Sequence, residues 1–285
     1  MTKVVYTSDP VSFGLRRVTP WSVSRDLLKH RALIASMTMR DFRATYRASN
    51  LGLVWQVFLP IIMLTIFYFV FGVILGGRFS SNTNETPIQY ALALFVGLGF
   101  FNFLAQNIGT APSLITSNVT YVKTLSFPLE ILSVVSVLNG LLNLMIGLAL
   151  TAVVLLFVHG HFYWSAVCTP FYVLCIFLIA LGVSWGLSAL SVFIRDISAV
   201  TSPLTLILMF MCPIFYPASM VPHRIKWIIS VNPLAVIIED ARAALLYGVW
   251  PRPAAVGTVF LVSLLFACAG YFVFIRLKSA FADVL

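Results

Sequence analysis

The chain has 285 residues, of which 60% are hydrophobic and only 9% are charged, and its mean hydropathy is +1.00. A water-soluble domain carries about a quarter charged residues, so the composition excludes an ordinary soluble protein and indicates one that resides in a membrane. The net charge of +9 does not indicate nucleic-acid binding, because the basic residues lie between apolar stretches rather than clustering on one water-facing element.

The segment ahead of the first apolar stretch, residues 1–50, is predicted to be cytoplasmic and to contain an amphipathic helix. Thr19 suits the N-cap and Pro20 the first helical position, and the helix is expected to run towards Tyr46. Its apolar stripe consists of Leu28, Ala32, Ala35, Met39, Phe42 and Tyr46, and Arg40, Arg43 and Arg47 lie on a neighbouring face. This pattern is typical of an interfacial helix, which either docks a cytoplasmic partner or anchors to anionic headgroups.

Six charge-free apolar stretches follow, at residues 51–76, 88–109, 131–158, 165–194, 201–216 and 254–275. They predict an all-α integral membrane protein with six transmembrane helices over residues 51–285. Only 201–216 is short for a bilayer core of about 30 Å, and it is bracketed by Pro203, Pro213 and Pro217. Prolines free backbone carbonyls, so this span is expected either to face protein or a solute path, or to be a kink satisfied by neighbouring helices.

The distribution of Lys and Arg predicts the orientation, because basic loops stay in the cytoplasm. Only Arg78, Arg224, Lys226, Arg242 and Arg252 lie on the side opposite the two termini. Both termini are therefore predicted to be cytoplasmic.

The longest external connection, residues 216–253, is predicted to form two short helices. They should be separated at Asn232 and Pro233, and Gly248 should close the second, which contains Arg242. We expect a re-entrant or surface-lying hairpin at the outer face, before the last span.

On the cytoplasmic side, residues 112–128 form a short amphipathic element that contains Ser117, Asn118 and Lys123. The element is longer than a tight helix connection. It either transmits force from a soluble partner or is an ordinary loop that lies on the membrane.

Catalytic chemistry is missing from the predicted spans. None of them contains Asp, Glu, Lys, Arg or His, which disfavours both an ion-coupled transporter and a membrane hydrolase. A phosphate-binding loop needs a Gly-Lys pair, and none of the five lysines follows a glycine. We therefore expect no catalytic, cofactor or metal site in this chain, so the energy for moving a solute must come from a partner.

Aromatic and carboxamide side chains are frequent at membrane depth. The aromatic rings either stack on sugars or are lipid-facing bulk and interfacial belts. The carboxamides are Gln56, Asn102, Gln106, Asn107, Asn139 and Asn143, and they either bond helix to helix or line a wet path for a neutral solute. The residues alone leave both pairs of interpretations open.

Several motifs resemble one known family. Residues 40–55 read RDFRATYRASNLGLVW and precede Pro60, and further matches are 127–132 (FPLEIL), 193–197 (FIRDI), 213–217 (PIFYP) and 232–234 (NPL). Together they resemble permease subunits of type-2 ABC exporters for bacterial polysaccharides, and the resemblance covers nearly the whole chain. Leu129 departs from the pattern, because relatives often carry a basic residue there, which puts the charge of that cytoplasmic element in doubt.

The resemblance implies a homodimer joined to two copies of a nucleotide-binding subunit that uses ATP and Mg²⁺. It implies export of a lipid-linked polysaccharide, such as an O-antigen, across a bacterial cytoplasmic (inner) membrane. The ATPase contacts would include Arg40, Arg43, Arg47, Ser117, Asn118 and Lys123, the sugar path Trp55, Phe67, Tyr68, Phe210, Phe215 and Tyr216, and the external hairpin Asn232, Pro233 and Arg242. A drug or lipid exporter of the same fold is the first alternative, and a membrane-embedded transferase the second.

Overall fold

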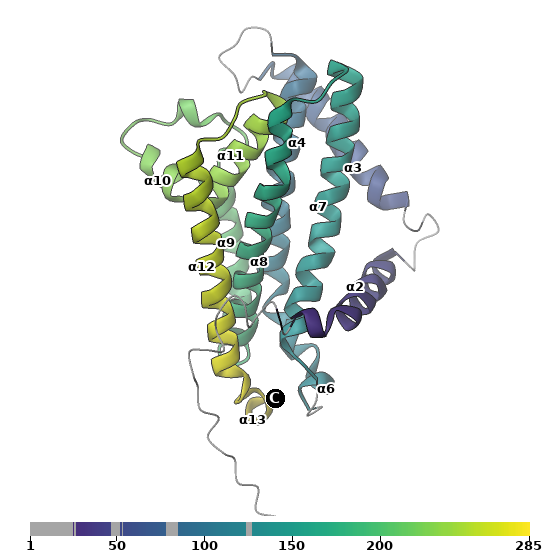
Figure 1. Ribbon diagram of the computed structural model, residues 1–285, viewed down its shortest axis with the longest axis vertical. Helices are drawn as coiled ribbons and strands as arrows, with labels where there is room; N and C mark the ends of the chain where they lie inside the picture. Colours follow the sequence, from purple (N-terminus) through teal and green to yellow (C-terminus); the bar gives the residue numbers. More distant parts are fainter. Residues whose placement is uncertain (1–24, 26, 47–51, 53, 78–84, 124–126) are drawn as a thin grey trace, which may run out of the picture.

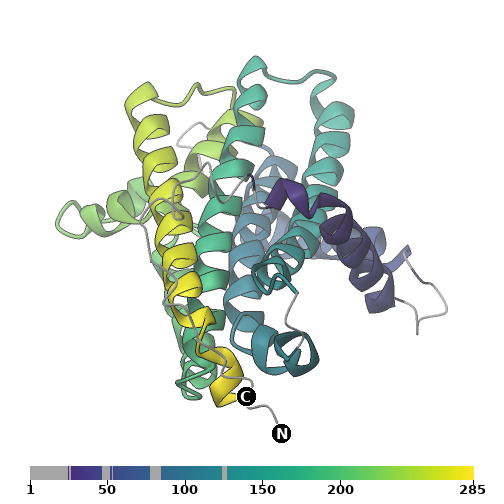
Figure 2. The ribbon, with the colours of Figure 1, turned by 60° about the horizontal axis from the view of Figure 1, so that its bottom comes forward.

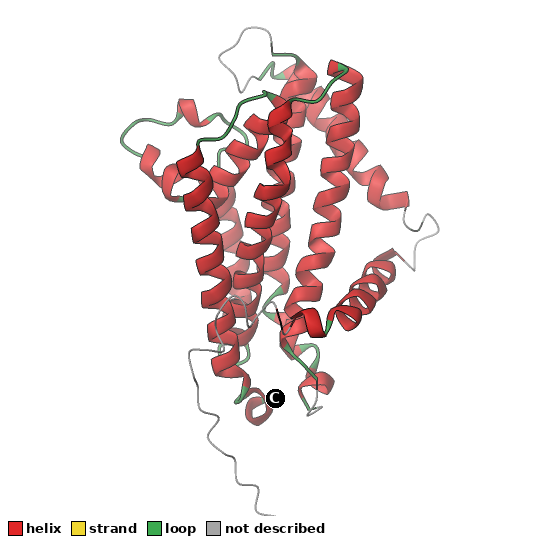
Figure 3. Cartoon of the chain, viewed as in Figure 1, coloured by secondary structure: helices red, strands yellow, loops and turns green. Residues whose placement is uncertain are grey.

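The protein is an elongated helical bundle (Figures 1 and 3). The structure, a computed structural model, describes residues 25, 27–46, 52, 54–77, 85–123 and 127–285. Every regular element in these residues is a helix, as predicted.

Five helical segments are long and apolar enough to cross a membrane. They are α3 (Val54–Phe67) with its π-helical continuation η2 (Tyr68–Ile74), α4 (Pro87–Thr110), α7 (Glu130–His159), η3 (Trp164–Cys168) with α8 (Thr169–Ser191), and α12 (Pro253–Lys278). The fifth predicted span is a shorter helix, α9 (Ile197–Met211), which has 15 residues. At 1.5 Å per residue it reaches only about 22 Å, less than the hydrocarbon thickness.

The closest packing in the bundle joins α8 to α12. A Cβ atom on Gly182 would collide with the carbonyl oxygen of Phe266, and one on Gly270 would collide with the carbonyl oxygen of Gly182. Trp185 packs edge-on against Tyr271, with 5.1 Å between ring centroids. Because lipid is as apolar as these side chains, close backbone approach at small residues is a main way to hold membrane helices together.

Helix α2 (Arg31–Tyr46) starts beside the lower end of α7 and slopes away from the bundle (Figures 1 and 2). Ile34, Met37 and Thr38 are its buried residues. Of the predicted apolar stripe, Leu28 is 65% exposed and Met39 47% exposed, so the stripe is a second apolar face beside the buried one. The predicted start at Thr19 and Pro20 lies outside the described residues.

The amphipathic element that was predicted to be cytoplasmic folds into two single-turn helices, α5 (Ser113–Thr116) and α6 (Val119–Val122). It is tied to α8, because the Ser191 hydroxyl donates to the Pro112 carbonyl at 2.8 Å. Ile115, which belongs to α5, is fully buried. A short helix, α13 (Phe281–Val284), closes the chain near the same end of the bundle (Figure 1).

The connection before α12 contains η4 (Ala218–Met220), α10 (Lys226–Val231) and α11 (Pro233–Leu246). The Asn232 side chain accepts a hydrogen bond from the Leu234 N–H at 3.1 Å, and Gly248 follows α11 with a φ of +71°. The boundaries of α11 thus fall where the capping residues predict. Nine residues of α11, among them Leu234, Ile237 and Ile238, are buried, and the helix contacts α4, α8 and α12, so α11 packs into the bundle.

Candidate functional site

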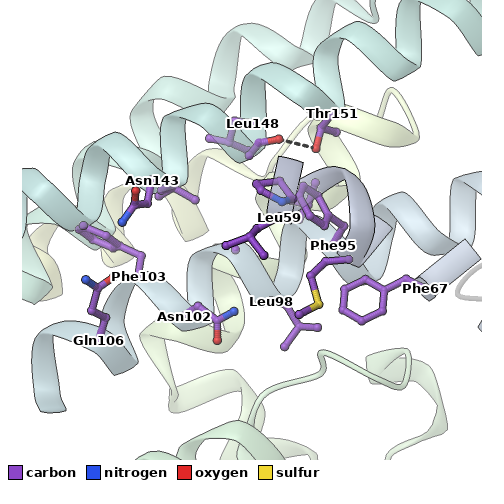
Figure 4. A pocket seen from close by; sticks show the side chains of 17 residues that line it. Leu59, Phe67, Phe95, Leu98, Asn102, Phe103, Gln106, Asn143, Leu148 and Thr151 are labelled. Atoms are coloured by element: carbon purple, nitrogen blue, oxygen red, sulfur yellow. Dashed lines mark hydrogen bonds between the residues drawn. The ribbon is translucent and has the colours of Figure 1, made fainter. Parts of the chain in front are cut away.

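A groove with a volume of about 290 Å³ lies between α3, α4 and α7 (Figure 4). Its walls are mainly apolar, but the exposed carboxamides of Asn102, Gln106 and Asn143 also line it. None of the described residues that line the groove is charged. The groove therefore offers hydrogen-bond donors and acceptors next to apolar surface, which suits a neutral solute rather than an ion.

Most of the carboxamides predicted at membrane depth fall into two groups. Asn139 belongs to neither, because its buried Oδ1 has no hydrogen-bond partner among the described residues. Asn107 donates to the Phe103 carbonyl of its own helix at 2.7 Å, and Gln56 donates to Asn143 Oδ1 at 3.4 Å, joining α3 to α7. These bonds fit the helix-bonding interpretation. Asn102 and Gln106 instead project from α4 into the groove (Figure 4), which fits the interpretation of a polar solute surface.

The aromatic residues predicted for the path are only partly brought together. Phe71 lies between two of them, with its ring centroid 6.1 Å from that of Phe67 and 6.2 Å from that of Phe215. Phe67 also lines the groove, so this trio adjoins it. Phe71 is an aromatic residue of the first predicted span but was not among the predicted path residues, and its spacing of four residues from Phe67 was the signal that would have placed it there.

The other predicted path residues lie apart from this trio. The Tyr216 hydroxyl donates to the Phe210 carbonyl at 2.9 Å, while the Phe210 ring itself is 63% exposed. Tyr68 is exposed as well. Trp55 packs edge-on against Phe58 near the start of α3, about 18 Å along the helix from Phe67 at 1.5 Å per residue.

Helix α9 ends at Met211, and side chains from neighbouring elements donate hydrogen bonds to backbone carbonyls of the residues that follow it. Arg242 Nη2 donates to the Pro213 carbonyl at 2.9 Å, and the Tyr90 hydroxyl donates to the Phe215 carbonyl at 3.4 Å. Of the two interpretations of the short fifth span, the structure shows the one in which neighbouring helices satisfy the break. Sequence reasoning placed Arg242 in the hairpin but not its partner in the broken segment.

Arg242 is only 3% exposed, which is unusual for a charged side chain. Burial lowers the pKa of Arg242, and its neighbours Tyr247, Glu239 and Glu85 act in the opposite direction. Burial likewise raises the pKa of Glu239, which Arg242 opposes. The Tyr247 hydroxyl donates to Glu85 Oε1, so the corner around the guanidinium is a connected polar cluster inside an apolar bundle.

The structure joins two elements that were predicted to contact the ATPase. Hydrogen bonds with the side chains of Tyr121 and Asp41 raise the pKa of Arg40, so α2 contacts α6. Arg43 on α2 and Lys123, which follows α6, are both exposed. Ser117 donates to the Ser113 carbonyl at 2.5 Å and Asn118 to the Leu114 carbonyl at 2.9 Å, while Arg47 lies outside the described residues.

The sequence of the chain is similar to those of known transport proteins. The family described as ABC-2 type transporter matches residues 32–246, from α2 to the end of α11. Two proteins named O-antigen export system permease protein RfbA from Klebsiella pneumoniae are 27% and 26% identical over 259 residues, which cover 89% of this chain and 95% of each relative. A protein of the same name from Myxococcus xanthus is 24% identical over 262 residues, covering 91% of this chain and 97% of the relative.

Proposed function

Because the chain belongs to the ABC-2 type transporter family, we propose that it is the membrane subunit of an ATP-driven exporter for a lipid-linked polysaccharide of the O-antigen type. The names of the relatives from Klebsiella pneumoniae and Myxococcus xanthus support this substrate class. Export would run outward across the cytoplasmic (inner) membrane of a bacterium, with both termini of the chain in the cytoplasm.

The groove between α3, α4 and α7 is the observation that carries the substrate assignment. Sugars present hydroxyl groups and apolar C–H faces, and the groove combines the carboxamides of Asn102 and Gln106 with the neighbouring rings of Phe67 and Phe71. The absence of charge among its described lining residues fits a substrate that must slide rather than bind tightly at one point. The aromatic path would run from this groove to Phe215, and the hairpin at Asn232, Pro233 and Arg242 would shape the outer exit.

The energy would come from two separately encoded ATPase subunits, which bind ATP and Mg²⁺, joined to two copies of this chain. Arg40 and Arg43 lie on α2 and Lys123 directly follows α6, so these elements offer basic, exposed side chains to such a partner. ATP binding would favour one conformation of the dimer through its greater affinity for that state.

Removing and restoring the gene in its own bacterium tests this proposal. Its loss is expected to abolish surface polysaccharide and to raise the amount of lipid-linked polymer inside the cell. Complementation with Asn102→Leu together with Gln106→Leu should restore only part of the surface polymer, whereas Phe157→Leu, which changes an exposed ring outside the groove, should restore all of it. Unchanged surface polymer on deletion, with loss of drug or lipid efflux instead, would contradict the assignment.

A further inference from the structure

A second groove, with a volume of about 680 Å³, lies where α2 meets the bundle. One wall comes from α2 and includes Arg31, Ala35 and Thr38, and the other comes from α7 and α8 and includes Leu138, Leu142 and Phe177. We call it the α2–α7 groove. It is almost wholly apolar, and its lining includes Ala35 and Met39 of α2 and Leu28, which precedes α2.

The length of the α2–α7 groove along α7 is close to the thickness of one leaflet of a bilayer. Its lining on α7 runs from Val134 to Leu142, which is a rise of about 12 Å. One leaflet contributes about half of the 30 Å hydrocarbon core. The groove begins one turn above Glu130, at the end of α7 that the basic loops place in the cytoplasm, and α2 slopes away from that end (Figures 1 and 2).

The polar groups of the α2–α7 groove favour an anion. The guanidinium of Arg31 is the charged group among its described lining residues, and this side chain is exposed. Glu130, the nearest acidic residue in sequence to the α7 wall, is engaged in an ion pair with Lys278 at 2.6 Å. The Thr38 hydroxyl is buried and has no hydrogen-bond partner among the described residues.

We propose that the α2–α7 groove binds one anionic phospholipid of the cytoplasmic leaflet. Its phosphate lies against Arg31, and an acyl chain follows the apolar wall of α7 towards Leu142. Charge complementarity at the rim and an apolar interior of one-leaflet depth select this ligand over a soluble protein, whose surface would not fill an apolar groove. The inference holds whatever solute the protein exports, because it concerns a lipid that stays in its own leaflet.

Native mass spectrometry of the full chain, purified from the membrane in detergent, measures the bound lipid. Phosphatidylglycerol added to the micelles should be retained in preference to phosphatidylcholine. Arg31→Gln should lower phosphatidylglycerol retention about fivefold, as expected for one basic residue at a membrane surface, while the matched control Arg43→Gln on the same helix should not. Ala35→Phe and Leu138→Trp, which fill the groove from its two walls, should reduce retention of both lipids.

Several results would overturn the proposal. Equal losses in Arg31→Gln and Arg43→Gln would show a diffuse basic surface instead of a site. Full retention of phosphatidylglycerol in both groove-filling variants would place the lipid elsewhere. Because Ala35 is exposed, Ala35→Phe should fold and measure lipid retention even if Leu138→Trp fails to fold. Displacement of phosphatidylglycerol by an equimolar amount of undecaprenyl phosphate would assign the groove to a lipid-linked substrate, and displacement by the ATPase subunit would assign it to a protein interface.

Discussion

Lys278, in the last turn of α12, forms an ion pair with Glu130, the first residue of α7, with 2.6 Å between Nζ and Oε2. The Trp185 indole donates to the Glu130 carbonyl at 3.0 Å, so α7, α8 and α12 meet at this residue. The element formed by α5 and α6 directly precedes this point in the chain. Glu130 therefore links the segment that follows α6 to both α8 and α12.

The Glu130–Lys278 pair is expected to contribute measurably to stability. Its side chains are only 15% and 32% exposed, so solvent screens the pair less than a surface ion pair, and we expect a coupling energy of about 1 kcal/mol. Thermal unfolding in detergent of Glu130→Gln, Lys278→Met and the double variant measures it. Strictly additive losses would mean that the two side chains do not stabilise each other.

The glycine contacts between α8 and α12 are expected to tolerate no side chain. Gly182→Ala and Gly270→Ala should each destabilise the protein by about 3 kcal/mol, because backbone atoms, not flexible side chains, occupy the space. Gly257→Ala, on the same α12 but with no described atom within 4 Å, is the matched control and should stabilise the helix by about 0.5 kcal/mol. The yield of folded dimer or monomer on size-exclusion chromatography, followed by thermal unfolding, separates the two groups. Equal changes in stability for all three alanine variants would rule out the close backbone contact between α8 and α12.

Arg242 is expected to hold the broken segment after α9 in place. Arg242→Met should lower the free energy of unfolding by about 3 kcal/mol, because it leaves the Pro213 carbonyl and the nearby half-buried carboxylates of Glu239 and Glu85 without their cation. Hydrogen exchange should become faster in residues 212–217. Arg252→Gln, an exposed basic residue ahead of α12, should change neither quantity. Unaltered exchange in Arg242→Met would show that packing alone holds the segment.

The basic face of α2 is expected to bind the ATPase subunit. Reversing charge with Arg40→Glu and Arg43→Glu should reduce the amount of ATPase that co-purifies with the chain, because both side chains are exposed on α2, which is predicted to be cytoplasmic. Arg224→Glu, exposed at the opposite end, provides the control. Full co-purification of the double variant would leave α2 as a lipid-binding helix only.

The sequence predicted well those features that depend on local backbone chemistry. Asn232 caps α11 and Gly248 follows its end because a side-chain acceptor and a residue that tolerates positive φ are needed at those places wherever the helix lies. Apolar runs likewise predicted the long membrane helices. The proline pattern correctly marked the fifth span as unusual, although α9 begins at Ile197 and ends at Met211, before Pro213.

The sequence could not predict which apolar residues face protein and which face lipid. In water, burial separates the two faces of a helix, but in a membrane both environments are apolar and the hydrophobic pattern does not distinguish them. Ile34 and Met37 of α2 are buried while Leu28 and Met39 are exposed, although all four are apolar. Long-range pairs such as Arg242 with the Pro213 carbonyl were out of reach for the same reason, because they depend on how the helices pack.

The glycine contacts between α8 and α12 limit how these two helices can move. Two helices whose backbones touch at Gly182 and Gly270 cannot slide past each other without a collision, so we expect them to stay fixed relative to each other. Helices α3 and α9 have largely exposed surfaces, α9 is short, and the residues that follow Met211 are held by the side chains of Arg242 and Tyr90. If the bundle opens for a solute, we therefore expect α3 and α9 to move relative to the fixed pair of α8 and α12.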